Sequence, residues 1–437
     1  MNKMGKTIAE KIFHNHLTKD SDEAKAGNYV LASPDIILLN DVSGPVAIKQ
    51  FDKIGAEKVA NKENIVIVLD HFSPPPNIDA AQNNKMLRDF AKKQGLKNIF
   101  EIGEGIEHTL LPESGFIKPG SLIIGGDSHT TTYGAFNSLG TGFGATDMGV
   151  SMALGYLWFL VPESINFEIN GKRPPFVTGK DLVLNIIDDI GVDGATYMSM
   201  EFSGDALLKF NVDEYMHISN MSVEAGAKSG IFQPNDNIIL WAKSKFLSQY
   251  DKLLVKSDFN ANYYLVKRYD ISKMEPMIAK PHSPGNISPI SEVEGIPVNQ
   301  VYIGNCANGT LTDLRQAASI LKGKKIAKGV RLIVVAATRS IYIEALKEGL
   351  IETFLNAGAF VTHSTCGACA GLHMGLLADE EIAITTTNRN FQGRMGSSKA
   401  KVYLSNAFVA AASAIKGEIT DPRKLAEWNE VSKFVYG

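Results

Sequence analysis

Residues 64–70 of the chain read Asn64-Ile-Val-Ile-Val-Leu-Asp70, and His71 follows directly. The apolar run is continuous rather than alternating, which is typical of a strand buried on both faces of a parallel sheet. Comparable short runs occur at residues 121–125, 301–303, 330–336 and 381–385. Helical patterns lie between them, for example at residues 312–322 and 341–355. This alternation predicts an α/β protein whose parallel sheets are covered by helices.

The length and two turn-rich stretches predict the domain organisation. The chain has 437 residues, and domains of about 150 residues are typical, so we expect about three of them. A polar segment begins at Val161-Pro-Glu-Ser164, and Lys280-Pro-His-Ser-Pro-Gly285 is rich in turn formers. We therefore predict α/β domains at residues 1–163, 164–285 and 286–437.

The composition excludes several classes of protein. Hydrophobic residues make up 44% of the chain and charged residues 21%, which excludes a disordered or fibrous protein. The 44 basic residues nearly balance the 47 acidic ones, so neither nucleic acid nor a membrane is expected as a partner. The longest apolar run, residues 152–161, is about half of what a bilayer requires. Three cysteines and no recognisable signal peptide complete the expectation of a soluble, cytoplasmic protein.

Polar residues follow the predicted strands at the point where each strand ends. The four groups are Asp70-His71, Asp127-Ser-His129, Gly304-Asn-Cys306 and Asn388-Arg389. In parallel α/β sheets, ligands bind outside the carboxyl ends of the strands. Carboxylate, imidazole, thiol and guanidinium groups at four such ends therefore predict one shared functional site.

The cysteines of the chain suggest a metal centre. Cys366-Gly-Ala-Cys369 is a C-x-x-C pair, and Cys306 lies upstream in a turn of glycine and asparagine. Three thiolates suit either a zinc ion with a fourth ligand or an iron–sulfur cluster in which one iron has no protein ligand. His363, three residues before Cys366, keeps the zinc interpretation open. A redox-active pair, or three buried structural thiols, are the remaining alternatives.

Several side chains suit acid–base chemistry and the binding of an acidic substrate. The candidates for proton transfer are Asp70, His71, His108, Asp127, His129 and Glu224. An adjacent carboxylate such as Asp70 fixes the tautomer of His71 and raises its basicity, which general acid–base catalysis requires. Arg389 and Arg394 lie five residues apart, and guanidinium groups bind carboxylates in a bidentate manner. The pair therefore favours a dicarboxylate or tricarboxylate as the substrate.

Four motifs, in this order along the chain, resemble those of the aconitase superfamily. They are Asp127-Ser-His-Thr130, Gly304-Asn-Cys-Ala-Asn-Gly309, Thr365-Cys-Gly-Ala-Cys369 and Asn388-Arg-Asn-Phe-Gln-Gly-Arg-Met-Gly396. The resemblance covers nearly the whole chain and is strongest to the large subunits of 3-isopropylmalate dehydratase and homoaconitase. It implies three aconitase-like α/β domains packed around a central iron–sulfur site, without the family's swivelling fourth domain.

The resemblance also implies the chemistry of the site. A 4Fe–4S cluster would be held by Cys306, Cys366 and Cys369, and the reaction would be the dehydration and rehydration of a 2-hydroxy dicarboxylate. His71 with Asp70 would protonate the departing hydroxyl, with further catalytic roles for the other acid–base candidates. The residues expected to contact the substrate are Asn40, Ser128, Asn220, Asn388, Arg389 and Arg394.

A separate small subunit is expected as the partner, because the resemblance places the swivelling domain and the serine that abstracts the C–H proton on another chain. The expected activity is that of 3-isopropylmalate dehydratase, a hydro-lyase of leucine biosynthesis. Homoaconitase, dimethylmalate dehydratase and a citrate aconitase are alternatives with the same reaction class. A zinc-bound structural protein and an RNA-binding relative are alternatives of another class.

Overall fold

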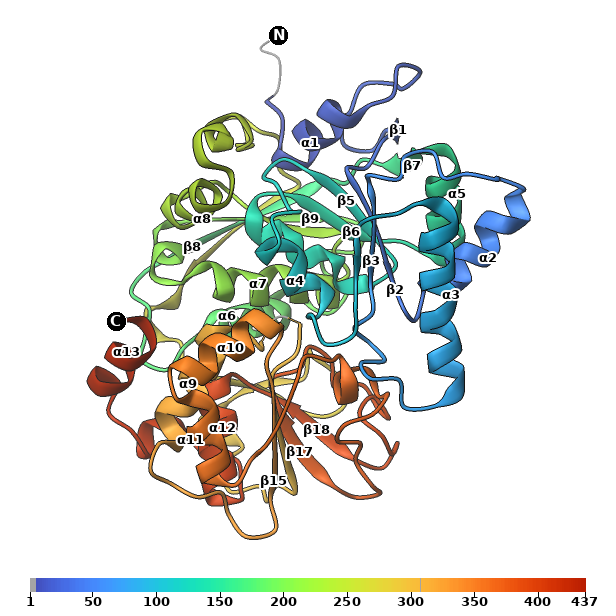
Figure 1. The fold of residues 1–437 in the computed structure, drawn as a ribbon. Coiled ribbons are helices and arrows are strands. Elements are labelled where there is room, and N and C mark those ends of the chain that lie inside the picture. The colour runs from blue at the N-terminus through green and yellow to red at the C-terminus, as the bar shows by residue number, and fades with distance from the viewer. Residues whose placement is uncertain (1–4, 307) are drawn as a thin grey trace.

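The computed structural model describes residues 5–306 and 308–437, so Ala307 in the Cys306 motif lies outside the described residues. Three sheets of mainly parallel strands follow one another along the chain, with helices packed on their faces (Figure 1). The predicted α/β fold class is confirmed. None of the described helices combines the length and the apolar character needed to cross a membrane.

The first sheet is five-stranded and parallel, in the order β4-β3-β2-β5-β6. Its strands are β2 (Ile36–Asn40), β3 (Ile65–Val68), β4 (Ile99–Phe100), β5 (Leu122–Gly125) and β6 (Leu139–Gly142). The helices of this part are α1 (Ile8–His16), α2 (Gly44–Ile54), α3 (Ile78–Gln94), α4 (Glu107–Glu113) and α5 (Ala145–Leu154). An antiparallel ribbon of β1 (Tyr29–Ala32) and β7 (Leu157–Leu160) completes it. The predicted strand at residues 64–70 is β3, and all four of its residues are buried as expected.

The second sheet is four-stranded and parallel, in the order β10-β9-β8-β11. Its strands are β8 (Ser164–Asn170), β9 (Ser199–Ser203), β10 (Ser229–Phe232) and β11 (Leu265–Asp270), and its helices are α6 (Gly179–Ile190), α7 (Val212–Met221) and α8 (Asp236–Phe246). Gly134, in the 3₁₀ helix η1 (Ser128–Phe136) of the first part, lies against β10. A Cβ atom at Gly134 would lie 1.8 Å from the carbonyl oxygen of Gly230, so this close approach requires glycine.

The third sheet is seven-stranded, in the order β13-β12-β18-β17-β14-β15-β16. Its strands are β12 (Met277–Ala279), β13 (Ile287–Pro289), β14 (Gln300–Ile303), β15 (Arg331–Val335), β16 (Phe360–Thr362), β17 (Ile382–Thr385) and β18 (Lys401–Leu404). The helices here are α9 (Leu311–Leu321), α10 (Arg339–Lys347), α11 (Leu350–Ala357), α12 (Ala407–Lys416) and α13 (Trp428–Tyr436). β12 pairs with β18 although it precedes residue 285, and the predicted division into three domains stays a prediction.

One predicted helix is wrong. The apolar pattern over residues 341–355 predicts a single helix, but the structure divides it into α10 and α11. Gly349 lies between them with a φ of 73°, the left-handed conformation that ends a helix and that glycine adopts without strain. The buried residues are Ile341 and Ala345 in α10 and Leu350, Ile351 and Phe354 in α11, whereas Ile343, Leu346 and Leu355 are exposed. The apolar pattern therefore did not reveal the break.

Candidate active site

His71 lies at the carboxyl end of β3, held between two carboxylates. Its Nδ1 is 2.7 Å from Oδ1 of Asp70, the residue before it. Asp41 directly follows β2, the neighbouring strand, and accepts the backbone N–H groups of His71 at 3.0 Å and Phe72 at 2.9 Å. These bonds fix the ring so that Nε2 lies 3.8 Å from a carboxylate oxygen of Asp127. The side chain is therefore oriented as a group that exchanges a proton through Nε2.

Asp127, at the end of β5, is where the predicted histidines meet. Its Oδ1 lies 2.9 Å from Nε2 of His108 and accepts the backbone N–H of His129 at 2.7 Å. Burial alone would raise the pKa of Asp127, but hydrogen bonds from His108, His129 and His71 hold it well below its usual value. Asp127 is thus an ionised carboxylate shared by three imidazoles.

The charges of this cluster also set the protonation of the imidazoles. Burial opposes the charged form of His71, but the Asp70 carboxylate and hydrogen bonds to Asp127 and Asp70 raise its pKa well above the usual value. His129 lies 3.1 Å from Glu224 through Nε2. Burial and the Arg389 charge both lower the pKa of His129, yet hydrogen bonds to Asp127 and Glu224 raise it overall. The raised pKa of His71 favours the imidazolium form, which a general acid needs.

Two acidic residues of the cluster were missed in the sequence. Glu107 begins α4 beside His108 and accepts a hydrogen bond from Asn40 at 3.2 Å. Burial and the charges of Asp70 and Asp127 raise the pKa of Glu107 well above its usual value. Asp41 is the other, and burial raises its pKa to about 6 against the opposing effect of the His71 charge. Asp41 follows a strand end and could have been found by the same rule as Asp70, whereas nothing distinguishes Glu107 from a surface residue of a helix.

The three cysteines lie at the carboxyl ends of the third sheet and in the loop after β16. Cys306 and Cys369 are buried and Cys366 is half-buried. Asn388 and Asn220 donate side-chain N–H groups to the sulfur of Cys306 at 3.3 and 3.5 Å. The hydrogen bond from Cys366 lowers the pKa of Cys369 to about 5, although burial opposes this. Burial and then the neighbouring thiol of Cys369 raise the pKa of Cys306.

The donor set fits an iron–sulfur cluster. Three sulfur ligands with amide N–H groups directed at them are the arrangement by which proteins hold and tune such clusters. Among the described residues of the site, three buried polar atoms have no hydrogen-bond partner in the chain: Oδ1 of Asn220, Oε2 of Glu107 and Nδ1 of His108. Buried polar groups are normally hydrogen-bonded, so these atoms are available to a bound group. His363, the candidate fourth zinc ligand, is exposed, and its ring lies beside Gly103 and Thr362.

Hydrogen bonds join the histidine cluster directly to the thiol loops. The backbone N–H of Cys366 donates to the carbonyl of Asp70 at 3.0 Å. Thr109, which follows His108, donates its hydroxyl to the carbonyl of Cys306. Nε2 of His373 lies 3.1 Å from the carbonyl of His71. The acid–base residues and the thiols therefore belong to one site, assembled from two different sheets.

The predicted substrate-binding residues border this site. Nε of Arg389 lies 2.6 Å from Glu224, and Nε of Arg394 donates to the carbonyl of Cys369 at 2.8 Å. The Arg389 side chain keeps 18% of its surface exposed, so it can meet a ligand that enters from solvent. Asn40, Asn220 and Asn388 are buried, whereas Ser128 is half-buried at the start of η1, between Asp127 and His129. The structure thus brings the predicted residues to one place.

Known proteins that resemble this chain belong to a family whose chemistry matches the residues of this site. The model of the aconitase family (aconitate hydratase) matches residues 10–417. The chain belongs to the aconitase family. It is 51% identical over 97% of its length to 3-isopropylmalate dehydratase large subunit 1 of Pyrococcus furiosus, of which the whole length is covered. It is 50% identical over 97% of its length to the 3-isopropylmalate dehydratase large subunit of Halothermothrix orenii, again over the whole of that protein.

Among solved structures, holo aconitase X of Thermococcus kodakaraensis has a TM-score of 0.48 and 12% identity, covering 85% of this chain and 88% of that chain. The family model and the curated relatives confirm the resemblance predicted from the four motifs, and with it the prediction of a hydro-lyase. An iron–sulfur centre is what membership of the aconitase family implies for the three cysteines.

Proposed function

We propose that this chain is the large subunit of 3-isopropylmalate dehydratase and carries a 4Fe–4S cluster on Cys306, Cys366 and Cys369. The observation that carries the proposal is that the thiols and the acid–base residues lie in one site. The backbone N–H of Cys366 donates to the carbonyl of Asp70, whose side chain contacts His71. The names of the curated relatives support the choice of substrate. When bound, the cluster would supply a Lewis-acidic iron that polarises the C–OH bond of a 2-hydroxy dicarboxylate.

The chain's own residues would handle the proton and the carboxylates. His71, which Asp70 keeps as imidazolium, would donate its Nε2 proton to the departing hydroxyl. Asp127 would hold the imidazoles of His108 and His129 in place and remain ionised while the proton moves. Two imidazoles and one carboxylate within hydrogen-bonding distance can also return the proton when water is added back.

The substrate would be held by charge and amide groups at the border of the site. Arg389 and Arg394 would bind the two carboxylates, and Glu224 would orient Arg389 through the contact at 2.6 Å. The substrate-facing amides would come from Asn40, Asn220 and Asn388, with the hydroxyl of Ser128 beside them. Asn220 and Asn388 also donate to the sulfur of Cys306, so the same two side chains would contact both the substrate and a ligand of the cluster.

The partner would be a small subunit that supplies the swivelling domain and the serine that abstracts the C–H proton. The relatives are large subunits by name, which supports the existence of such a partner. We expect the isolated chain to be inactive or nearly so. Cytoplasmic localisation and the absence of nucleic acid from the complex remain part of the proposal.

The test is a substrate panel. The chain would be produced anaerobically with a small subunit encoded by the same organism, and turnover would be measured on 3-isopropylmalate, homocitrate, dimethylmalate and citrate. Preferred turnover of 3-isopropylmalate supports the proposal. Preference for another acid would move the assignment to homoaconitase, dimethylmalate dehydratase or aconitase, and no turnover with any of them would contradict it. Tight binding of an RNA stem-loop by the cluster-free chain would favour the RNA-binding alternative.

A further inference from the structure

Lys180 is a fully buried charged residue that the proposed reaction does not use. Its side chain is 0% exposed, and it is the second residue of α6, which Thr178 caps. Taking an ammonium group out of water is unfavourable unless it is well hydrogen-bonded. The position adds to this cost, because the positive end of the helix dipole lies at the first turn. A lysine at this place therefore indicates a specific function for its charge or its hydrogen bonds.

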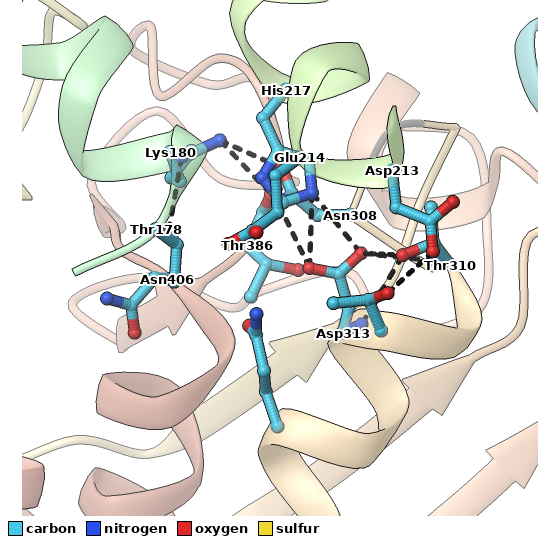
Figure 2. Close-up of polar contacts among 12 residues, drawn as sticks. Thr178, Lys180, Asp213, Glu214, His217, Asn308, Thr310, Asp313, Thr386 and Asn406 are labelled. Carbon is cyan, nitrogen blue, oxygen red and sulfur yellow. Dashed lines mark hydrogen bonds and ion pairs between the residues drawn. The ribbon is translucent and has the colours of Figure 1, made fainter. Parts of the chain in front are cut away.

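The partners of Lys180 are three oxygen atoms on two loops. Nζ donates to the carbonyl of Thr387 at 2.7 Å, to that of Thr386 at 3.2 Å and to Oδ1 of Asn308 at 3.4 Å. Figure 2 shows Lys180 directed at Asn308 and Thr386. Thr386 and Thr387 precede Asn388, which donates to the sulfur of Cys306. Lys180 therefore joins the loop that carries Cys306 to the loop that carries its hydrogen-bond donor.

Asn308 extends this contact into a buried network on the far side. Its backbone N–H donates to Oδ1 of Asn305 at 2.7 Å, and its side-chain N–H donates to Asp313 at 3.3 Å. Asp313 also lies 3.3 Å from Nε2 of His217 and caps α9 with Thr310 (Figure 2). The amide of Asn308 is thus fixed with its oxygen toward Lys180. In the hydrogen-bond network, the amide of Asn308 stands between the ammonium of Lys180 and the carboxylate of Asp313.

The remaining charges around Lys180 come from the candidate active site. Among the described residues, no carboxylate oxygen lies within 4.0 Å of its Nζ as a direct ion pair. Burial lowers the pKa of Lys180 to about 8, and the charges of Cys369, Asp313, Cys306 and Glu224 oppose this effect. As thiolate ligands, Cys306 and Cys369 would therefore attract the ammonium of Lys180, although it does not hydrogen-bond to them.

We propose that Lys180 is a positioning residue for the iron–sulfur site: it fixes the Cys306 and Asn388 loops against each other and places a positive charge on the loops that adjoin these residues. The inference rests on the proposed cluster. Three thiolates give a 4Fe–4S centre a net negative charge, and nearby charge and hydrogen bonds set its reduction potential and stability. The charge of Lys180 favours the reduced state of the cluster, which is the more negative one. Its hydrogen bonds hold Cys306 and the donor Asn388 in their relative positions.

The experiment compares Lys180→Met with wild type in the anaerobic complex. Methionine has a similar length and keeps the buried volume, but it removes the charge and the three hydrogen bonds. Lys228→Met is the matched control, because Lys228 is half-buried and lies 5.0 Å above the Phe143 ring, away from the thiols. The measurements are iron and sulfide content, the midpoint potential of the centre, and the rate at which iron is lost to a chelator.

We expect the reduction equilibrium of Lys180→Met to shift at least tenfold toward the oxidised state, which is about 59 mV to more negative potential for one electron. We also expect iron to be lost several-fold faster, with neither change in Lys228→Met. A merely structural role would leave the potential unchanged, and a potential within error of wild type would overturn the inference. If Lys180→Met does not fold, Lys180→Gln replaces it with the same expectation.

A second, independent variant is expected to shift the midpoint potential in the opposite direction. Asp313→Asn removes the carboxylate behind Asn308 and should move the potential in the positive direction, while damage to packing alone predicts no reversal of sign. A negative or zero shift in Asp313→Asn contradicts the electrostatic part of the inference. Wild-type complex without iron and sulfide would instead remove the proposed cluster, so the two failures are distinguishable.

Discussion

The candidate site has two sides, here called the histidine wall and the thiol wall, which suit different chemistry although both are built at the carboxyl ends of strands. The histidine wall (Asp70, His71, His108, Asp127 and His129) lies at the ends of the first sheet, and each imidazole faces a carboxylate. The thiol wall (Cys306, Cys366, Cys369 and Asn388) belongs to the third part of the chain, where side-chain amides donate to Cys306 and Lys180 hydrogen-bonds the loop before Asn388. Proton transfer requires carboxylates that shift the pKa values of the neighbouring imidazoles. Thiolate ligands instead require hydrogen-bond donors that are neutral, so that the sulfur charge remains available to the metal.

The largest effect is expected on the thiol wall. Replacing Cys306, Cys366 or Cys369 with serine should reduce iron from about four per chain to less than about one, because each thiolate is a proposed ligand of the cluster. Circular dichroism should show the α/β fold largely retained. The exposed His363→Ala variant is the control and should keep wild-type iron. Full iron content in any of the serine variants would contradict the assignment of that ligand.

The second-largest effect is a loss of turnover without loss of the cluster, which distinguishes the histidine wall from the thiol wall. His71→Ala should retain iron and sulfide but lose turnover in the complex by roughly 10²–10⁴-fold, the range for a general acid. Assays of kcat alongside iron content test this directly. His14→Ala, an exposed histidine of α1, serves as the control. Loss of the cluster in His71→Ala would mean that the walls are not separable, and normal turnover would remove the catalytic role.

A smaller effect is expected where the substrate meets the site. Arg389→Lys keeps a positive charge but cannot reproduce the planar fork, so KM for the dicarboxylate should rise on the order of tenfold or more. Iron content should not change, since Arg389 contacts Glu224 rather than a thiol. Steady-state kinetics provide the measurement. An unchanged KM would show that Arg389 does not bind a carboxylate of the substrate.

The smallest effect is a displacement of the pH profile. Asp70 raises the pKa of His71, so activity should fall as the pH rises through that raised pKa, where the imidazolium loses its proton. Asp70→Asn removes this charge and lowers the pKa of His71. The alkaline limb of kcat should then move to lower pH, and a profile that coincides with wild type would show that Asp70 does not control the protonation of His71.

The placement of most site residues could be predicted because it follows from topology. Asp70, Asp127 and Cys306 come directly after buried apolar runs, and parallel strands bring their carboxyl ends to one edge of a sheet. Glu107 and Lys180 could not be predicted, since each lies in a helix where a charged residue is normally solvated. Only the packing of α4 against the Cys306 loop, and of α6 against the loop after β17, gives those two residues their roles.

The measurement that tests the account most directly is the content of iron, zinc and acid-labile sulfide in the wild-type chain after anaerobic purification. We expect about four irons and four sulfides per chain, with three irons as the product of oxidation at the iron without a protein ligand. Stoichiometric zinc without sulfide would contradict it, because the thiol wall would then hold a structural ion and the histidine wall would have no Lewis acid opposite it.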